Sequence, residues 1–539
     1  MKQLSIILMA AFFSSFFPKP EPPIPLANPP EGFVSVDGME FKINGEPYRF
    51  IGTNFWYGMH LGVPSQRERL IKELDKLQEI GCNNLRIMVG SEGPGDEKYR
   101  VQPPLMIKPF EYNEDILEGL DFLLVEMEKR DIYGVLVLGN FWHWSGGFAQ
   151  YLSWLDDKPI PYPSLDGGVS WGVYMDYTFR FYSNKRAKNW FKAHVKKIVE
   201  RTNTVTGKPY KDDPTIMAWQ LANEPKCGVK VSAYRNWIRQ TTKFIRKMDP
   251  NHLISTGSEG IMSESLFGNR RKNFIKNHSM GIDYLTAHIW IQNWGWYDPH
   301  KVPTLETSQK KAIAYLDKHI EIAKEMNMPV VLEEFGIARD AESYDATSTV
   351  VQRDSYFKFM FEYLEKNIKE GSPYQGMNFW AWRGEGRPRV PRSVCEARDD
   401  LIGDPPHEYQ GWYSVYNTDT TTHELIKSFN DRNPLEGLKI LKDKFLTKSE
   451  NNLFQNNNEQ IARLEEAKRI ISLTTLNYFR QKKKQNEKPN RKDIREFKTF
   501  FQGMDNIKSV LHDRQDEEIR KVANEVYDIQ RPNQSKKEF

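Results

Sequence analysis

Two glutamates each follow a short apolar run and are candidates for acid–base chemistry. Glu224 stands in WQLANEPKCG, and Glu334 stands in VVLEEFG. Two facing carboxyl groups can cleave a glycosidic bond, because one protonates the leaving oxygen while the other, ionised, faces the anomeric carbon. Each glutamate also has a structural alternative, since Asn-Glu-Pro can cap a helix and a glutamate at a strand end can pair with an arginine. Their occurrence together favours catalysis.

Other polar and aromatic residues follow further apolar runs at comparable positions. They are Arg86, Asn140, Trp142, Asn223, His288, Trp290 and Trp380. Taken singly, Arg86 can form an ion pair under the sheet, His288 can be a hydrogen-bonded core histidine, and Trp380 can be core packing. A shared binding site explains better why several strands all end in such groups.

The apolar runs that precede these residues are predicted to be eight strands, at 48–54, 84–89, 133–138, 216–222, 253–257, 284–288, 330–334 and 376–380. Segments with apolar residues at positions i, i+3 and i+4 lie between them and are predicted to be helices, at 65–80, 113–129, 185–200, 232–247, 308–325 and 351–369. This alternation of strand and helix predicts an α/β fold with parallel strands joined by crossovers.

Eight such units predict a closed (β/α)8 barrel, or TIM barrel, whose active site is built by the loops that follow the strands. The rival is an open doubly wound sheet, which would need a glycine-rich phosphate loop after an early strand. The segment GTNFWYG at 52–58 is not such a loop. Upstream, Asp37-Gly38 and Asn44-Gly45 are typical hairpin turns, so two short strands are expected before the barrel.

The composition narrows the function classes. The chain has 76 Lys and Arg against 72 Asp and Glu, so it lacks the broad basic field of a dedicated nucleic-acid binder. Its 14 Trp offer flat apolar faces of the kind that stack on sugar rings. Its 3 Cys exclude a disulfide-built scaffold. Cys82 is expected to be a buried small hydrophobe, while Cys227 and Cys395 fall in predicted catalytic-face loops and could pair.

Both ends of the chain differ from the predicted barrel at 32–433. The apolar stretch within 1–17 is typical of a signal peptide, with a buried N-terminal helix as the alternative, and it predicts a secreted or periplasmic protein. Residues 18–31 form a proline-rich linker. Residues 434–539 contain no Trp and are predicted to be a charged helical extension. No later segment is expected to cross a membrane.

The barrel segment resembles glycoside hydrolase family 5, a family of retaining (β/α)8 glycosidases, and within it the endo-β-1,4-mannanases. The resemblance is carried, in this order, by GTNFWYG, NNLRIMV, LGNFWHWSGG, WQLANEP, TAHIWIQNWGW, VVLEEFG and GMNFWAW. It implies that Glu224 is the general acid/base and Glu334 the nucleophile.

The same resemblance implies roles for the neighbouring residues. Arg86 would keep the nucleophile ionised, Asn223 would bind the sugar 2-hydroxyl, and Trp380 would lie beneath that sugar. Trp142 and Tyr57 match aromatic positions that line neighbouring subsites. His288 would also belong to the substrate-binding group.

The chain departs from many family members after the sixth strand, where it has His288-Ile289-Trp290 in place of His-x-Tyr. An indole N–H can donate a hydrogen bond but cannot accept one or ionise. Trp290 is therefore expected to donate to Glu334, or else the tyrosine's role is lost. Strand alternation predicts that Glu333 points away from Glu334 and makes a supporting contact.

The resemblance implies an endo-acting retaining β-mannanase that cuts mannan, galactomannan or glucomannan by double displacement. The alternatives are an endo-β-1,4-glucanase of the same family and an inactive β-glycan-binding protein. The sequence has no His-x-x-x-His pair or cysteine cluster at metal-ligand spacing, so neither a metal nor a cofactor is expected.

Overall fold

The computed structural model describes residues 30–95, 97–163, 167–265, 267–396, 399–401 and 403–430. The predicted signal peptide and helical extension lie outside these residues, as does the predicted linker apart from Pro30 and Glu31. Within the described ranges, no helix has both the length and the apolar character needed to cross a bilayer.

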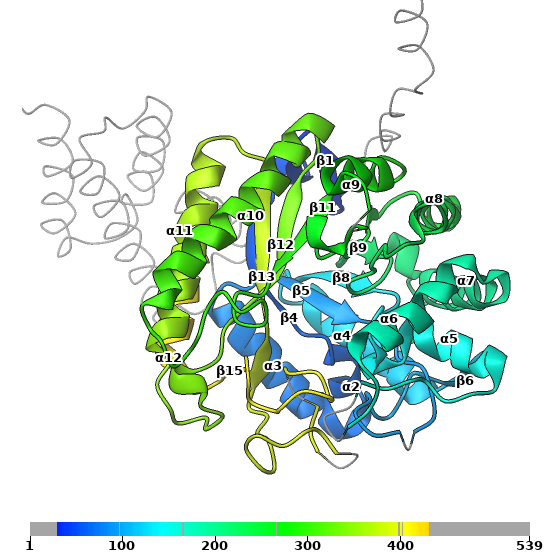
Figure 1. Cartoon of the computed structure of the whole chain (residues 1–539), viewed down its shortest axis with the longest axis horizontal. Helices are drawn as coiled ribbons and strands as arrows, with labels where there is room; N and C mark the ends of the chain where they lie inside the picture. The colour runs from blue at the N-terminus through cyan, green and yellow to red at the C-terminus, as the bar shows by residue number, and fades with distance from the viewer. Residues whose placement is uncertain are drawn as a thin grey trace, which may run out of the picture. The chain divides into compact units, whose positions relative to one another are not determined.

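Eight parallel strands form the barrel, and each coincides with a predicted strand. They are β4 (Phe50–Asn54), β5 (Asn84–Met88), β8 (Tyr133–Val137), β9 (Ile216–Gln220), β10 (Leu253–Ser255), β11 (Leu285–Ile289), β12 (Val330–Phe335) and β13 (Tyr374–Phe379). Their order in the sheet is β10-β9-β8-β5-β4-β13-β12-β11. Between the two end strands, the N–H of Asp283 donates to the carbonyl of Ile254 at 2.9 Å, so the sheet is a nearly closed (β/α)8 barrel (Figure 1).

Helices surround the barrel, and the six predicted ones are confirmed to within a few residues at each end (Figure 1). The α-helices are α2 (Gly58–Leu61), α3 (Arg67–Glu79), α4 (Glu114–Glu128), α5 (Gly147–Asp156), α6 (Trp171–Phe179), α7 (Lys185–Val199), α8 (Val231–Met248), α9 (Arg270–His278), α10 (Thr304–Met326), α11 (Val351–Lys369) and α12 (Thr420–Asn430). Each crossover helix buries one apolar stripe; in α3 this stripe includes Leu70, Leu74 and Leu77.

A small antiparallel sheet of three strands precedes the barrel: β1 (Val34–Asp37), β2 (Glu40–Ile43) and β3 (Glu46–Pro47). The two predicted turns are both present, although they join three strands and not two. Val34 and Phe41 are buried against residues near the amino ends of the barrel strands, such as Phe50 and Val331. The hairpin therefore closes the floor of the barrel, opposite the catalytic face. Two further sheets, β6 (Met106–Lys108) with β7 (Glu111–Tyr112) and β14 (Trp382–Gly384) with β15 (Val415–Tyr416), lie in loops.

A buried carboxylate ties α4 to the segment between α7 and β9. Asp121 is fully buried, and its oxygens accept hydrogen bonds from Arg201 at 2.7 and 2.9 Å and from the Tyr210 hydroxyl at 2.6 Å. Burial alone would raise the pKa of Asp121, but these bonds and those from Thr204 lower it. The contact fixes the helical ring beneath the barrel.

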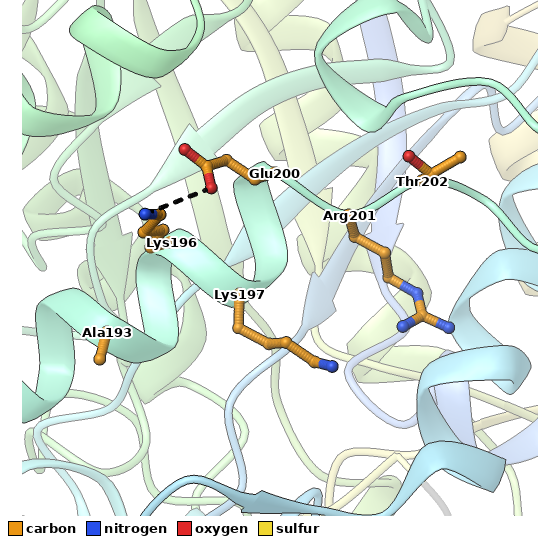
Figure 2. Close-up of a pocket in the computed structure, with 6 residues that line it drawn as sticks. All are labelled: Ala193, Lys196, Lys197, Glu200, Arg201 and Thr202. Carbon is orange, nitrogen blue, oxygen red and sulfur yellow. Dashed lines mark ion pairs between the residues drawn. The ribbon is translucent and has the colours of Figure 1, made fainter.

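A depression of about 460 Å³ lies beside this contact, at the end of α7, lined by Ala193, Lys196, Lys197, Glu200, Arg201 and Thr202 (Figure 2). Lys196 and Glu200 form an ion pair across it at 3.7 Å. Because it lies where the chain enters β9, it belongs to the amino-terminal face of the barrel. Catalytic groups of this fold are found at the opposite face.

Candidate active site

Glu224 lies just beyond the end of β9, in an unusual backbone conformation. Its φ of 47° falls in the left-handed region, which costs free energy for a residue with a Cβ atom. Its N–H donates to the carbonyl of Gly257 at 2.9 Å, which holds this conformation. The side chain is 7% exposed. Oε1 lies 2.8 Å from Nδ1 of His288, and Oε2 accepts a hydrogen bond from the Trp142 indole at 2.6 Å.

Glu334 extends from the end of β12 toward the same point. Its carboxylate is 3% exposed and accepts a hydrogen bond from Nη1 of Arg86, with which it also forms an ion pair. Arg86 comes from β5, so the cation reaches across the barrel interior. The guanidinium thus places a permanent positive charge against the proposed nucleophile.

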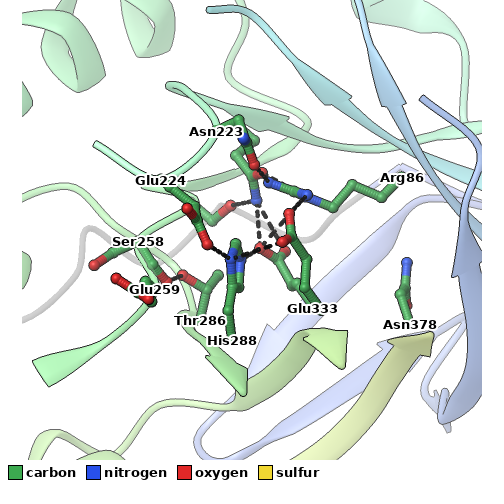
Figure 3. A network of polar contacts seen from close by, with 12 residues as sticks. Arg86, Asn223, Glu224, Ser258, Glu259, Thr286, His288, Glu333 and Asn378 are labelled. Atoms are coloured by element: carbon green, nitrogen blue, oxygen red, sulfur yellow. Dashed lines mark hydrogen bonds and ion pairs between the residues drawn. The ribbon is translucent and has the colours of Figure 1, made fainter. Parts of the chain in front are cut away.

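His288, at the end of β11, bridges the two carboxylates. Its Nδ1 is 2.8 Å from Oε1 of Glu224 (Figure 3). The same nitrogen is 3.3 Å from Oε2 of Glu334. One oxygen of each carboxylate and a nitrogen of His288 all lie within 4.8 Å of one another. Retaining glycosidases place their carboxyl groups about 5–5.5 Å apart, whereas inverting ones leave about 6.5–9.5 Å for a water molecule. The separation therefore fits a retaining site.

The bridge also sets the protonation of the site. Burial lowers the pKa of His288, but the charge of Glu334 and hydrogen bonds with Glu224, Glu333 and Glu334 raise it well above its ordinary value. Burial raises the pKa of Glu224, but the bond and charge of His288, the charge of Lys226 and the Trp142 bond together lower it. In the free protein these contacts favour a protonated His288 beside an ionised Glu224.

Glu333 does not point away from Glu334 as strand alternation predicts. The pairing of β11 with β12 shifts after Ala287, so that Leu332 and Glu334 have partners and Glu333 does not. This β-bulge turns both carboxylates into the barrel, because an extra residue breaks the alternation. Glu333 lies 3.7 Å from Nε of Arg86 (Figure 3). It also accepts two hydrogen bonds from Gln220, at 2.8 and 2.9 Å. Glu333 therefore makes a supporting contact, as expected, but its side chain lies inside the barrel.

The orientation of Arg86 depends on residues that the sequence pattern did not single out. Nε donates to Gln220 at 2.8 Å and Nη1 to Asn54 at 3.1 Å. Nη2 donates to Asn223 at 2.8 Å, which places that amide beside the nucleophile. Asn54 ends β4 and Gln220 ends β9, so their position at strand ends was the signal that could have found them.

Asn140 connects the asparagine of the NEP motif to the backbone of Trp142. Its Oδ1 accepts hydrogen bonds from Nδ2 of Asn223 at 3.2 Å and from the backbone N–H of Trp142 at 2.9 Å. Residues 140 and 223 also form a parallel bridge beyond β8 and β9. The two strand ends therefore place Trp142 against Glu224 as a unit.

Trp290 and Trp380 lie together on the other side of the carboxylates. Their rings are 5.8 Å apart and nearly perpendicular, and Trp290 also lies 5.4 Å from the ring of Tyr413. Among the described residues, no hydrogen bond joins the Trp290 indole to Glu334. Trp380 is 4% exposed, so only an edge of it is open to a sugar.

Tyr57 does not reach the cleft. It is fully buried, and its hydroxyl donates to the carbonyl of Trp382 at 2.9 Å. The ring packs against Phe55 and Trp56 at 4.9 and 5.3 Å. The prediction that it lines a subsite is wrong, because the loop after β4 turns this side chain into the core.

Loops on one side of the barrel mouth interlock. The Trp56 indole donates to the carbonyl of Gly403 at 2.9 Å, and its ring lies 5.3 Å from that of Trp144. The rings of His143 and His407 are 4.9 Å apart. These contacts join the loops after β4, β8 and β14 into a wall beside the catalytic centre.

The described residues contain one group of potential metal ligands and three free thiols. The group of potential metal ligands found there is Glu224, His288 and Glu334, and Arg86 already supplies a positive charge to it. Cys82 and Cys227 are buried, Cys395 is partly exposed, and all three thiols are free, so the considered pairing of Cys227 with Cys395 is absent.

Comparison with known proteins places this site in a family. A family model described as GH family 5 beta-mannosidase-like matches residues 31–435. The chain belongs to this family. A putative mannan endo-1,4-beta-mannosidase 4 of Arabidopsis thaliana is 31% identical over 380 residues, which cover 67% of this chain and 85% of the relative. Mannan endo-1,4-beta-mannosidase 4 of Solanum lycopersicum is 30% identical over 397 residues, which cover 71% of this chain and 91% of the relative.

Solved structures agree with this family 5 hydrolase in fold. A family 5 mannosidase from Rhizomucor miehei has a TM-score of 0.68 and 38% identity, covering 74% of this chain and 97% of its own. A mutant of that mannosidase has been solved in complex with mannosyl-fructose. An endo-beta-1,4-mannanase from Thermotoga petrophila has a TM-score of 0.53 and 25% identity, and the match covers 72% of this chain and 77% of the mannanase chain. The predicted family and fold are confirmed, and the chain is a glycoside hydrolase.

Proposed function

We propose that this family 5 hydrolase is a retaining endo-β-mannanase that cuts β-1,4-mannosidic bonds within mannan, galactomannan or glucomannan. The carboxylate pair carries the proposal: Glu224 and Glu334 leave different strands and lie within 4.8 Å, bridged by His288. The names of the plant and Thermotoga relatives support mannan as the substrate.

In the proposed mechanism, Glu334 attacks the anomeric carbon and forms a covalent glycosyl-enzyme, while Glu224 protonates the leaving oxygen. Glu224 then takes a proton from water, which hydrolyses the intermediate with retention. Both oxygens of Glu224 are occupied in the free protein, by His288 and by Trp142. These contacts orient the carboxyl group, and the protonated His288 is a proton source within hydrogen-bond distance of it.

An assay with galactomannan, glucomannan and carboxymethylcellulose side by side tests the substrate class. Cleavage of the first two with little action on the third supports a mannanase. Preference for carboxymethylcellulose would indicate an endoglucanase, and binding without cleavage of any of the three would indicate an inactive binding protein.

Release of single mannosyl units from chain ends is a second candidate activity, and one observation favours it. The wall formed by Trp56, Gly403, His143 and His407 bounds one side of the catalytic centre, whereas an endo-acting enzyme needs a cleft open along the chain. The Rhizomucor relative is named a mannosidase. Viscosity and reducing ends of galactomannan, measured together, separate the two: rapid loss of viscosity supports endo action, and reducing ends released at nearly constant viscosity support exo action.

We also propose that the chain is exported by the apolar segment at 1–17. Expression of the full chain with and without residues 1–17 tests this, because only the full chain should release activity into the medium or periplasm. Equal release from both would contradict it.

A further inference from the structure

We propose that Lys226 and Glu259 form a positioning pair that holds the Trp142 indole against Glu224 and sets the charge around that carboxylate during proton transfer. The inference rests on the proposed function, because it concerns the acid/base step of β-mannoside cleavage. Neither residue is among those that the sequence pattern singled out.

Lys226 stands two residues after the acid/base, yet its side chain is turned inward and is only 18% exposed. Its ammonium forms an ion pair with Glu259, whose side chain is 8% exposed, in the loop after β10. Glu259 is held by its own backbone, since its carbonyl accepts the N–H of His288 at 3.1 Å and the Tyr315 hydroxyl at 2.9 Å. The pair is therefore anchored to β11 and α10.

The ammonium of Lys226 also lies 5.3 Å from the centre of the Trp142 ring. A buried cation is attracted to the face of an indole, and removal from water strengthens the attraction. The indole N–H of the same ring donates to Oε2 of Glu224 at 2.6 Å. Lys226 thus acts on the face of a ring whose edge holds the acid/base carboxylate.

The charges around Glu224 come from several elements. His288 approaches from β11, Glu334 from β12, Lys226 and Glu259 from the loops after β9 and β10, and Glu408 from the loop after β14. Burial lowers the pKa of Lys226, but the charges of Glu259, Glu224 and Glu334 raise it above its ordinary value. Burial raises the pKa of Glu259, and the charge of Glu224 raises it further against the opposing charge of Lys226.

The two members of the pair act on Glu224 in opposite directions. The cation of Lys226 favours the ionised form of Glu224, and the anion of Glu259 opposes it. Structural damage alone would not produce effects of opposite sign. This gives a test that does not depend on the size of any loss in rate.

The experiment measures kcat/KM against pH for mannotetraose with wild type, Lys226→Met, Glu259→Gln, the double variant and Lys226→Arg. The alkaline limb of this pH profile reports loss of the proton from the acid/base. We expect it to move up by roughly one pH unit in Lys226→Met and down in Glu259→Gln. The double variant and Lys226→Arg should lie near the wild-type limb. Far-UV circular dichroism and melting curves confirm that each variant is folded.

A second substrate separates proton transfer from other effects. With 2,4-dinitrophenyl β-mannoside the leaving group needs no proton, so the variants should share one alkaline limb of kcat/KM. The proposal would be overturned if the alkaline limbs of Lys226→Met and Glu259→Gln moved in the same direction or did not move. A change in KM alone would also overturn it. If wild type cleaves neither substrate, the proposed function itself fails, and that outcome is distinct from unshifted limbs in an active enzyme.

Discussion

The two carboxylates share His288 but differ in their other partners, and this difference fits the proposed roles. Glu334 meets the permanent charge of Arg86, whereas Glu224 accepts a hydrogen bond from the Trp142 indole. The nucleophile must stay ionised, and the acid/base must gain and lose a proton in each turnover. The strained φ of Glu224 lies at this functional point.

Substitution of each carboxylate separates the roles. Glu334→Ala should lower turnover of every β-mannoside by roughly 10⁴-fold or more, because no covalent intermediate can form. Glu224→Ala should lose mannotetraose cleavage to a similar extent, yet still form the intermediate from 2,4-dinitrophenyl β-mannoside. A burst of dinitrophenol measures this. A burst in Glu334→Ala, and none in Glu224→Ala, would exchange the assignments.

Glu408 provides a prediction of pH-dependent stability. Burial, with the charges of Asp404, Glu334 and Glu224, raises its pKa to about 8. In the unfolded chain the pKa of Glu408 is near the ordinary value for a glutamate. Between that pKa and pH 8 the folded chain therefore binds one more proton at this group than the unfolded chain does. The contribution of Glu408 to the free energy of unfolding thus falls as pH rises through this range. Glu408→Gln lacks this slope.

Melting temperatures of wild type and Glu408→Gln between about pH 4 and about pH 10 check the sign. The melting temperature of the variant minus that of wild type should grow as pH rises and level off above pH 8. A difference that shrinks over this range would contradict the stated environment of Glu408.

At the scale of elements, periodicity predicted the strands and crossover helices because burial of one face imposes a regular spacing. Irregular backbone broke those rules. The bulge in β12 turned Glu333 inward against strand alternation, and the loop after β4 buried Tyr57. The pairing of Lys226 with Glu259 joins two loops, and no local pattern in a single sequence records such a contact.

Substitution of Asp121 tests how much its buried ion pair stabilises the ring of helices around the barrel. Removing one partner of a buried ion pair leaves the other charge uncompensated, so Asp121→Ala should lower the free energy of unfolding by about 3 kcal/mol. Because the contact lies on the face away from the site, kcat at 25 °C should stay near wild type. Urea unfolding measures the loss, and the exposed Glu118→Ala on the same helix is the control. Equal stability of the two variants would contradict the anchoring role.

At the scale of the whole molecule, the barrel contains every group assigned to catalysis. The described residues end with α12, whose His423, Ile426 and Phe429 are buried and complete the ring of helices around the barrel. We therefore expect the segment after 433 to be dispensable for chemistry.

Removal of residues 436–539 should leave kcat on soluble galactomannan within about threefold, a change in barrier below about 0.7 kcal/mol. The full chain, purified in parallel, is the reference, and a melting curve shows that the truncated protein is folded. A hundredfold loss in a folded truncated protein would show that the extension takes part in the site.

Covalent trapping of the nucleophile tests the central claim most directly. 2-Deoxy-2-fluoro-β-mannosyl fluoride should form a stable glycosyl-enzyme, because the fluorine at C2 slows both formation and hydrolysis of the intermediate while the fluoride leaving group speeds its formation. Intact mass should rise by one fluoromannosyl unit, and peptide fragmentation should place the label on Glu334. A label on Glu333 or Glu224, or an active enzyme that takes up no label, would contradict the account.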